Sequence, residues 1–253
     1  MSDPAPPLPP ALLPRLRQAF GSAFDPARLT LVLQGNYGNA RVLRLDLDDR
    51  VLAIKEYHSR SWFIRHTVGR FMIWQEVRSL AALAKLPGVP HDLTPIDAVT
   101  YAMEWINGHS LTQLHRDLNV RLPKSFFLEL EELVARMHQA GVVHLDIRNL
   151  GNIMQGSDGR PYLLDFQSAF STRLLPGFVR RIMEAADRSG IYKAWRLLCD
   201  EPLDPERTAF ADRFKRWRKL WIFKGYWLSE FFRNRQQNEE TASSAPPPPP
   251  PAP

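Results

Sequence analysis

Residues 142 to 169 read VVHLDIRNLGNIMQGSDGRPYLLDFQSA, and this stretch decides the fold. It holds Asp146 and Asp165, each just after apolar residues that predict a strand or a core segment, with a polar turn between them. Two carboxylates brought together at strand ends form a site for a hard cation and for a hydroxyl proton, as phosphoryl transfer requires. Asn152 lies between them in the sequence and adds a neutral oxygen ligand. Taken alone, either acid would more often cap a turn.

The segments HLDIRNLGN and LLDFQSA resemble the catalytic loop and the metal-binding DFG segment of protein-kinase-like folds, with Gln167 in place of the glycine. The resemblance implies the active site of an ATP-dependent phosphotransferase. Carried over by position, Asp146 would orient the acceptor hydroxyl and accept its proton, and Arg148 would stabilise the γ-phosphate. Asn152 and Asp165 would bind Mg²⁺.

One spacing departs from the common kinase loop, because Asn152 follows Asp146 by six residues instead of five. Either the loop carries an extra residue or Asn149 takes the metal position. Asn152 is followed directly by the apolar start of the next strand, so its register matches the kinase pattern on that side, and we favour it. His144 is expected to be structural, since no nucleophile is paired with it.

The chain from residue 29 to 57 predicts a β-meander, since the alternating runs LTLVLQ, ARVLRLDL and VLAIKEY are separated by GNYG and DDR. The first turn, GNYGNARV, matches the kinase glycine-rich loop GxGxxGxV only in part. Gly35 and Val42 match, whereas Tyr37 and Ala40 replace the other two glycines. Such a turn is more often a plain hairpin, although its backbone amides could bind phosphates.

The third of these runs puts Lys55 on the same strand face as Ala53, while in FMIWQEVRSLAALAKL the apolar residues follow helical spacing with Glu76 beside them. An isolated strand lysine usually protects a sheet edge. Kinase folds pair such a lysine with a helix glutamate to hold the α- and β-phosphates. The resemblance therefore implies an ion pair between Lys55 and Glu76.

Between these two residues lies HSRSWFIRHTVGR, in which Arg60, Arg65 and Arg70 are interleaved with histidine and aromatic residues. Two interpretations remain open. The segment is either a solvated basic loop or a place where guanidinium groups meet an anionic substrate.

The stretch AVTYAMEWINGHSL predicts a strand that leads into a turn, and it resembles the kinase hinge. Met103 would then guard the back of the adenine pocket, and the backbones of Glu104 and Ile106 would bind adenine. Next, KSFFLELEELVARMHQAG predicts a helix that stops at Gly141 and delivers the catalytic loop.

After residue 169 the resemblance to eukaryotic protein kinases fades, because no APE triplet appears. Residues 175–187 and 190–199 predict two helices, and DPER predicts the start of another with Asp204 as its N-cap. This last helix has an aromatic stripe that includes Phe214, Trp217 and Trp221, and eight Lys or Arg between residues 213 and 235. The stripe either packs in the core or lies on anionic lipid.

Composition narrows the range of partners and locations. The 253 residues are 44% hydrophobic, enough for one bilobal domain or two small ones, and a formal net charge of +6 favours anionic partners. The single cysteine, Cys199, excludes an internal disulfide and suits a reducing compartment. No signal peptide and no run approaching about 20 apolar residues is present. We expect a cytoplasmic protein and leave open a peripheral contact with an anionic membrane at its inner face.

The expected fold class is α+β, a bilobal protein-kinase-like fold with a small β-rich N-lobe at 26–106. A mostly helical C-lobe at 107–236 has a short C-terminal region. The ends, 1–25 and 237–253, are rich in proline, and residues 1 to about 14 and 241 to 253 are expected to be polyproline tails.

Among kinase-like families, the GVVHLD form and the basic segment after the lysine strand are most similar to bacterial lipopolysaccharide-core sugar kinases (Kdo and heptose kinases) and RIO-like relatives. This likeness implies ATP and Mg²⁺ as cofactors and a hydroxyl of a glycolipid sugar as acceptor. A RIO-like kinase acting on serine or threonine of a protein is one alternative. A nucleotide-binding pseudokinase scaffold is another, prompted by Gln167 and the incomplete glycine loop. Nucleic acid is not an expected partner.

Overall fold

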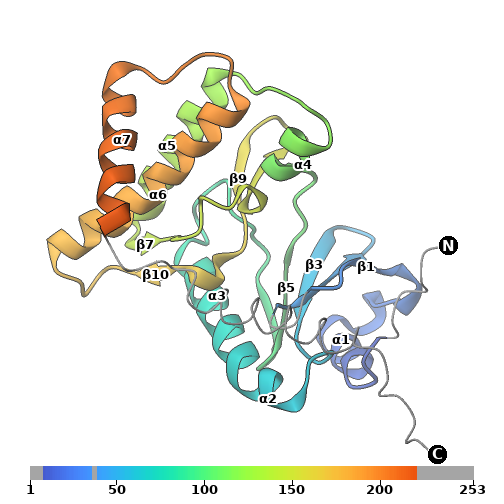
Figure 1. The fold of residues 1–253 in the computed structure, drawn as a ribbon. Coiled ribbons are helices and arrows are strands. Elements are labelled where there is room, and N and C mark those ends of the chain that lie inside the picture. Colours follow the sequence, from blue (N-terminus) through green and yellow to red (C-terminus); the bar gives the residue numbers. More distant parts are fainter. Residues whose placement is uncertain (1–7, 36–38, 221–253) are drawn as a thin grey trace, which may run out of the picture.

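The structure is a computed structural model that describes residues 8–35 and 39–220. A small lobe holds a β-sheet, and a larger lobe is mostly helical (Figure 1). The five strands of the sheet lie in the order β1-β2-β3-β5-β4, with every neighbouring pair antiparallel. They are β1 Leu29–Leu33, β2 Arg41–Asp46, β3 Val51–Glu56, β4 Thr94–Asp97 and β5 Thr100–Glu104. The predicted meander is therefore confirmed.

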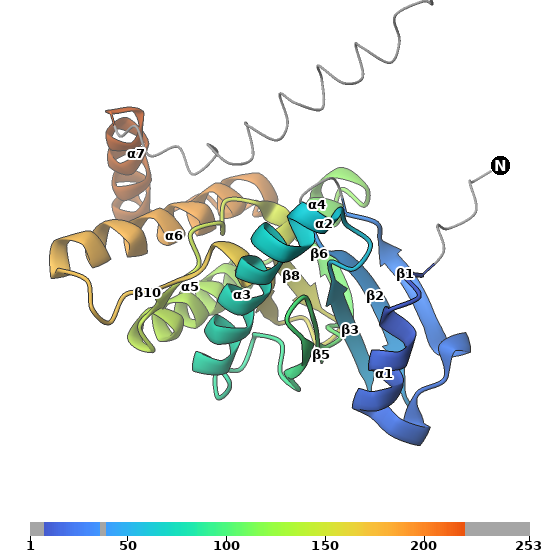
Figure 2. The ribbon, with the colours of Figure 1, turned by 90° about the horizontal axis from the view of Figure 1, so that it is seen from below.

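A helix that the sequence did not predict covers one face of this sheet (Figure 2). It is α1, Leu12–Phe20, and Leu12 and Leu16 are fully buried against strand residues such as Leu45 and Ile54. The expectation of a polyproline tail up to about residue 14 is therefore wrong for residues 12–14. Pro14 lies in the first turn of the helix, where a backbone N–H has no intrahelical partner to lose.

The other face of the sheet packs against a second helical segment. It begins as α2 Trp62–Ile64, continues through one π-helical turn Arg65–Gly69 and ends as α3 Arg70–Ala82. Gly69 lies directly on Tyr57, since a Cβ at this position would be 2.8 Å from the tyrosine ring. The close approach fixes where the helix crosses the sheet. Ile73 and Leu80 then enter the core.

The larger lobe is built from four helices and two small sheets. The helices are α4 Leu111–Arg116, α5 Lys124–Gln139, α6 Gly177–Leu198 and α7 Pro205–Leu220. One sheet has the order β6-β8-β9, with β6 Gly108–Ser110, β8 Ile153–Gly156 and β9 Pro161–Leu163. The other pairs β7 Val142–Val143 with β10 Phe170–Ser171. Short 3₁₀ turns occupy Gly21–Ala23, Pro26–Arg28, Leu150–Asn152 and Phe166–Ser168.

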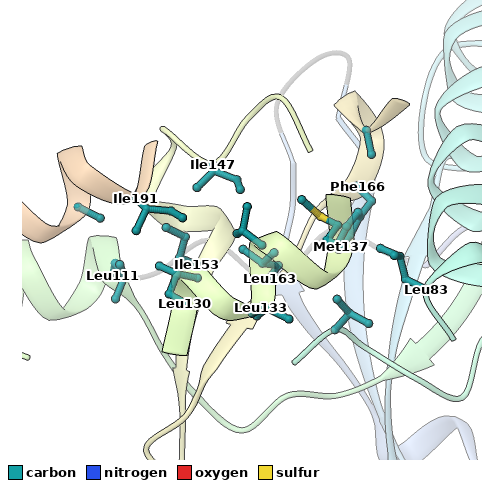
Figure 3. Close-up of a cluster of buried hydrophobic side chains, with 14 of the residues drawn as sticks. Leu83, Leu111, Leu130, Leu133, Met137, Ile147, Ile153, Leu163, Phe166 and Ile191 are labelled. Carbon is teal, nitrogen blue, oxygen red and sulfur yellow. The ribbon is translucent and has the colours of Figure 1, made fainter. Parts of the chain in front are cut away.

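Apolar side chains from the helices and from a small sheet of the larger lobe meet in one core (Figure 3). Leu130 and Met137 of α5 face Ile153 of β8, Leu163 of β9 and Ile191 of α6, and all five are buried. The strands that flank the loop at 142–153 are therefore anchored in the same core as the helices. This core holds the polar loop in a fixed position.

Two expectations for the last helices have different outcomes. The segments predicted as helical at 175–187 and 190–199 are helical over most of their length, but the division into two helices is wrong, because α6 runs from Gly177 to Leu198 without a break. The predicted start of α7 is confirmed, since the Asp204 carboxylate accepts a hydrogen bond of 2.9 Å from the Arg207 N–H. In α7, Phe214 stacks on Phe210, and Trp217 is 43% exposed.

Part of the basic aromatic stripe predicted between 213 and 235, including Trp221, lies outside the described residues, as do 1–7 and the tail at 241–253. Within residues 8–35 and 39–220, no helix is both long enough and apolar enough to cross a bilayer.

Candidate active site

Three charged side chains from distant parts of the chain meet between the lobes. The Nζ atom of Lys55, on β3, lies 2.7 Å from Oε1 of Glu76, on α3, and 3.0 Å from Oδ1 of Asp165, which follows β9. The Phe166 N–H also donates to Oε1 of Glu76, at 3.1 Å. The predicted ion pair between Lys55 and Glu76 is thus present, and it ties both lobes to the segment that carries Asp165.

Burial and charge act together on these groups. Burial alone would lower the pKa of the Lys55 ammonium, but the carboxylates of Asp165 and Glu76 outweigh it and raise that pKa. Burial would raise the pKa of Asp165, yet Lys55 holds it below its ordinary value. Burial dominates at Glu76 and raises its pKa. At neutral pH Lys55 is a cation and Asp165 an anion, as binding of a metal and phosphates requires.

Asp165 keeps part of its carboxylate available although Lys55 holds one of its oxygens. Its backbone is left-handed, at φ 62° and ψ 71°, and 41% of its side chain is exposed. Such a conformation is strained for a residue other than glycine and persists where neighbours enforce it. Here the next residue, Phe166, is fully buried and packs on the ring of His144 at 4.7 Å.

Asp146 and Asn152 are in contact on the loop after β7. The Nδ2 atom of Asn152 donates to the backbone oxygen of Asp146 at 3.1 Å and to its Oδ2 at 2.9 Å. The Asn149 carboxamide instead turns back, accepting from Gly151 N–H at 3.1 Å and donating to Asn152 Oδ1 at 3.3 Å. Asn149 also contacts Asp146, because its backbone N–H donates to the Asp146 backbone oxygen at 3.2 Å. Asn152 differs in donating from its side chain to both the backbone and the carboxylate of Asp146.

A buried carboxylate on α6, Asp187, holds the backbone of this loop, and no pattern in the sequence predicted this role. It accepts hydrogen bonds from the N–H groups of His144 at 2.8 Å and Leu145 at 2.7 Å, and contacts Nε2 of His138 at 2.9 Å. Leu145 is left-handed, at φ 65°, directly before Asp146. His144 is fully buried and bonds the backbone oxygen of Leu164, the structural position expected for it.

Helix α6 also fixes the other side of the loop. Nη1 of Arg148 donates to the backbone oxygen and to Oγ of Ser189, both at 3.2 Å, so this guanidinium is directed toward α6. Lys193 Nζ donates to the backbone oxygen of Arg148 at 2.8 Å. Gly190 lies against the loop backbone, since a Cβ there would be 2.8 Å from the carbonyl carbon of Ile147. No sequence motif marks Asp187, Ser189 or Lys193, because their partners here are largely backbone atoms distant in the chain.

The glycine turn is held by an arginine from the basic segment. Gly35 has φ +67°, and a Cβ there would lie 2.3 Å from the backbone oxygen of Ala40. The Arg60 guanidinium donates to the backbone oxygens of Gln34, Gly35 and Asn39. Arg60 therefore acts on the turn itself, which neither open interpretation of its segment had included.

The predicted nucleotide contacts share one face of the sheet. Val42 pairs directly with Lys55, and Met103 pairs with Ala53, so their side chains point to the same side of the sheet. Met103 is 5% exposed, as a side chain at the back of a pocket should be.

At the strand end, Glu104 N–H donates to the His91 backbone oxygen at 2.8 Å, and its carboxylate accepts from His91 N–H at 3.0 Å. Any contact between the Glu104 backbone and a base therefore falls to its carbonyl oxygen. Ile106 is 8% exposed just beyond, at the start of the turn into the larger lobe.

The donor set suits magnesium better than a transition metal. Among the residues that the structure describes, no group of three or more His, Cys, Asp or Glu could hold a metal. Asp165 and Asn152 offer one carboxylate and one amide, both oxygen ligands. Mg²⁺ is commonly bound by one or two carboxylates with waters and substrate phosphates completing its shell.

The sequence matches no protein-family model and no curated protein. Among solved structures, the chain is similar to the Rio2 kinase-ADP/Mg²⁺-phosphoaspartate complex from Chaetomium thermophilum, with a TM-score of 0.50 and 15% sequence identity. The chain has a protein-kinase-like fold. The match covers 72% of this chain and 61% of the Rio2 chain, so the chain spans about three fifths of that protein. At this identity the likeness shows the fold alone.

Proposed function

We propose that the protein is an ATP-dependent kinase that moves the γ-phosphate of ATP to a hydroxyl group. The observation that carries the proposal is the contact of Lys55 with both Glu76 and Asp165, at 2.7 and 3.0 Å. A fold needs no such buried group of charges for stability, since ion pairs of this kind are costly to desolvate. The Rio2 structure of the same fold was solved with ADP and Mg²⁺, which supports the same ligands here.

Each residue has a defined task in this proposal. Lys55 would bind the α- and β-phosphates, and Asn152 and Asp165 would hold Mg²⁺, which neutralises charge on the phosphates when bound. Asp146 would accept the proton of the acceptor hydroxyl. The hydroxyl oxygen would form the new bond to the γ-phosphorus while the bond from this phosphorus to ADP breaks. Arg148 would stabilise the γ-phosphate, and its Nη1 atom is bonded to Ser189 in the structure.

The acceptor we propose is a sugar hydroxyl of the lipopolysaccharide core, supported by the sequence resemblance to Kdo and heptose kinases. A serine or threonine of a protein is the alternative acceptor, in keeping with a Rio2-like fold. A pseudokinase scaffold fits less well, because Lys55, Glu76, Asp146, Asn152 and Asp165 are all in place. Scaffolds that only bind nucleotide have no use for a proton acceptor such as Asp146.

Phosphate transfer from labelled ATP tests the proposal. Purified protein is incubated with Mg²⁺ and either inner-core glycolipid or a protein substrate, next to the Asp146→Asn variant. We expect labelled glycolipid from the wild type and a loss of about 10²- to 10⁴-fold in the variant, since a neutral amide is a poor proton acceptor. If only the protein substrate is labelled, the acceptor is a serine or threonine and not a glycolipid sugar. A variant as active as the wild type would refute the proposed site.

A further inference from the structure

We infer that the outer face of α2 and α3 docks the protein on an anionic lipid bilayer. This α2–α3 face consists of Trp62, Phe63, Arg70, Phe71, Trp74 and Arg78. The inference goes beyond the proposed function and does not depend on it, because it concerns a surface without catalytic residues. In Figure 2 the two helices run in line on the side of the molecule turned toward the viewer.

The face is unusual for its large exposed aromatic side chains. The exposed fractions are 68% for Trp62, 67% for Phe63, 56% for Phe71 and 52% for Trp74. Their ring contacts are within the helical segment itself, between Phe71 and Trp74 at 6.1 Å and between Trp62 and His66 at 4.8 Å. Scattered apolar residues need no explanation, but a contiguous apolar patch marks an interaction surface.

The π-helical turn brings these side chains onto one side. In a straight α-helix, Phe63 and Phe71 are about 2.2 turns apart and would point roughly 80° away from each other. The π-helical turn at Arg65–Gly69 has more residues per turn than an α-helix, so it reduces this angle and turns Phe63 toward the side of Phe71. Wide turns of this kind often mark functional positions.

The charge around the face has one sign. From residue 57 to 91 the chain has five Lys or Arg and a single acid, Glu76, which is fully buried and paired with Lys55. The Arg78 guanidinium lies over the Trp74 ring at 5.1 Å, and Arg70 is exposed. An occupant that complements this face is therefore anionic.

Aromatic and basic side chains on one helical face suit a bilayer better than an acidic protein. Tryptophan and phenylalanine insert at the boundary of headgroups and acyl chains, while arginines meet the anionic headgroups. The residues beyond 220, another candidate occupant, carry three basic residues, Lys224, Arg233 and Arg235, and three acids, Glu230, Glu239 and Glu240, so their net charge is zero. This segment therefore has no net negative charge to complement the basic face, whereas the headgroups of an anionic bilayer do.

Vesicle binding tests the inference with the full-length protein. The vesicles contain phosphatidylcholine alone or phosphatidylcholine and phosphatidylglycerol in a three-to-one ratio, without nucleotide. We expect binding only to the anionic vesicles, falling with salt. Arg70→Gln and Arg78→Gln should each lower the partition coefficient about fivefold, which corresponds to ~1 kcal/mol per basic residue near the surface.

Controls separate this face from α7. The pair Lys215→Gln and Arg216→Gln removes two exposed charges from α7 and should leave binding unchanged. The pair Trp62→Phe and Trp74→Phe should keep binding but abolish the blue shift of tryptophan fluorescence that vesicles cause. The inference is overturned if the wild type does not bind anionic vesicles at low salt. It is also overturned if only the α7 pair reduces binding, or if the blue shift survives in the phenylalanine variant.

Discussion

Burial makes the Asp146 carboxylate more basic, which suits the proton acceptor proposed for this position, and it costs stability at the same time. Burial is the largest influence on its carboxyl group and raises the pKa above the ordinary value of about 3.9. Asn152 opposes this by donating a hydrogen bond to Oδ2. The structure therefore places the more basic carboxylate of Asp146 next to the Asn152 amide, which is proposed to bind Mg²⁺ together with Asp165.

The raised pKa of Asp146 predicts two pH effects. Mg²⁺-dependent ADP formation should lose kcat/KM on the acid side at a pH above the ordinary aspartate range, because the group must be ionised to accept a proton. The folded state holds the Asp146 carboxyl proton more tightly than the unfolded chain does. Protonation of Asp146 therefore stabilises the folded state fully below the ordinary aspartate pKa, and this stabilisation is lost as pH rises through the raised pKa of the folded state. Asp146→Asn should therefore be at least as stable as the wild type at neutral pH.

Urea unfolding at several pH values measures the second effect. The difference in unfolding free energy between Asp146→Asn and the wild type should move in favour of the variant as pH rises from acid to neutral. A difference that moves the other way would mean that the Asp146 pKa is lowered, contrary to its burial.

Arg60 is a residue whose role only the structure reveals, since its guanidinium reaches three backbone oxygens of the glycine turn. Arg60→Lys keeps the charge but replaces a planar fork by a single ammonium group. We expect the KM for ATP to rise about tenfold with little change in kcat, as positioning of the turn is lost. Arg65→Lys, in the neighbouring helical turn, is the matched control. An unchanged KM in Arg60→Lys would show that the charge alone matters, and an equal rise in both variants would show that the effect is not specific to the contacts of Arg60.

At the scale of elements, α6 supports the loop that carries Asp146. Asp187 binds two loop N–H groups, Lys193 binds a loop carbonyl oxygen, and Gly190 allows the helix to approach. A glycine in a helix interior costs up to about 1 kcal/mol relative to alanine. The close approach to the loop is the reason that the helix keeps this residue.

Gly190→Ala is therefore expected to damage activity more than stability. Its Cβ would lie 2.8 Å from Ile147 C and 2.9 Å from Arg148 N, so the loop must shift. We predict a fall in turnover of roughly 10- to 100-fold, as displacement of a catalytic group by about 1 Å can cause. Gly177→Ala is the control, since none of the residues that the structure describes lies within 4 Å of its Cβ, and it should stabilise α6 slightly. Unchanged turnover in Gly190→Ala would contradict the role of α6.

The sequence predicted elements well where periodicity and turn residues agreed, and less well elsewhere. The meander, α5 and the start of α7 carry clear alternation, helical spacing or a cap. The sequence predicted two helices where α6 is continuous, and Gly190 is tolerated inside α6 because it lies against the loop backbone at Ile147 and Arg148. Helix α1 was missed because prolines surround its first turn, where they do not oppose a helix.

For the candidate site, the sequence predicted which residues belong to it better than it predicted the contacts that hold them in place. Lys55, Glu76 and Asp165 were singled out from the resemblance, and the structure brings them together. Asp187 and Arg60 could not be found in this way. Both act on backbone atoms far away in the sequence, and backbone partners leave no pattern of residue types.

At the scale of the whole molecule, the small lobe has two apolar layers, one on each face of its sheet. Helix α1 completes the layer away from the site, so it is a structural part of the lobe. Leu16→Ala should lower the free energy of unfolding by about 2 to 5 kcal/mol, because the side chain is fully buried. Arg17→Ala, exposed on the same helix, should change it by less than about 0.5 kcal/mol. Equal effects in urea unfolding would show that α1 does not pack as described.

The central claim is that Lys55, Glu76 and Asp165 form a site for Mg-ATP between the lobes. Calorimetric titration with a non-hydrolysable ATP analogue measures this without knowledge of the acceptor. The account predicts binding by the wild type that requires Mg²⁺ and weakens about tenfold or more in Asp165→Asn, which loses a metal ligand. Absence of binding by the wild type at millimolar analogue, or equal affinity in Asp165→Asn, would contradict it.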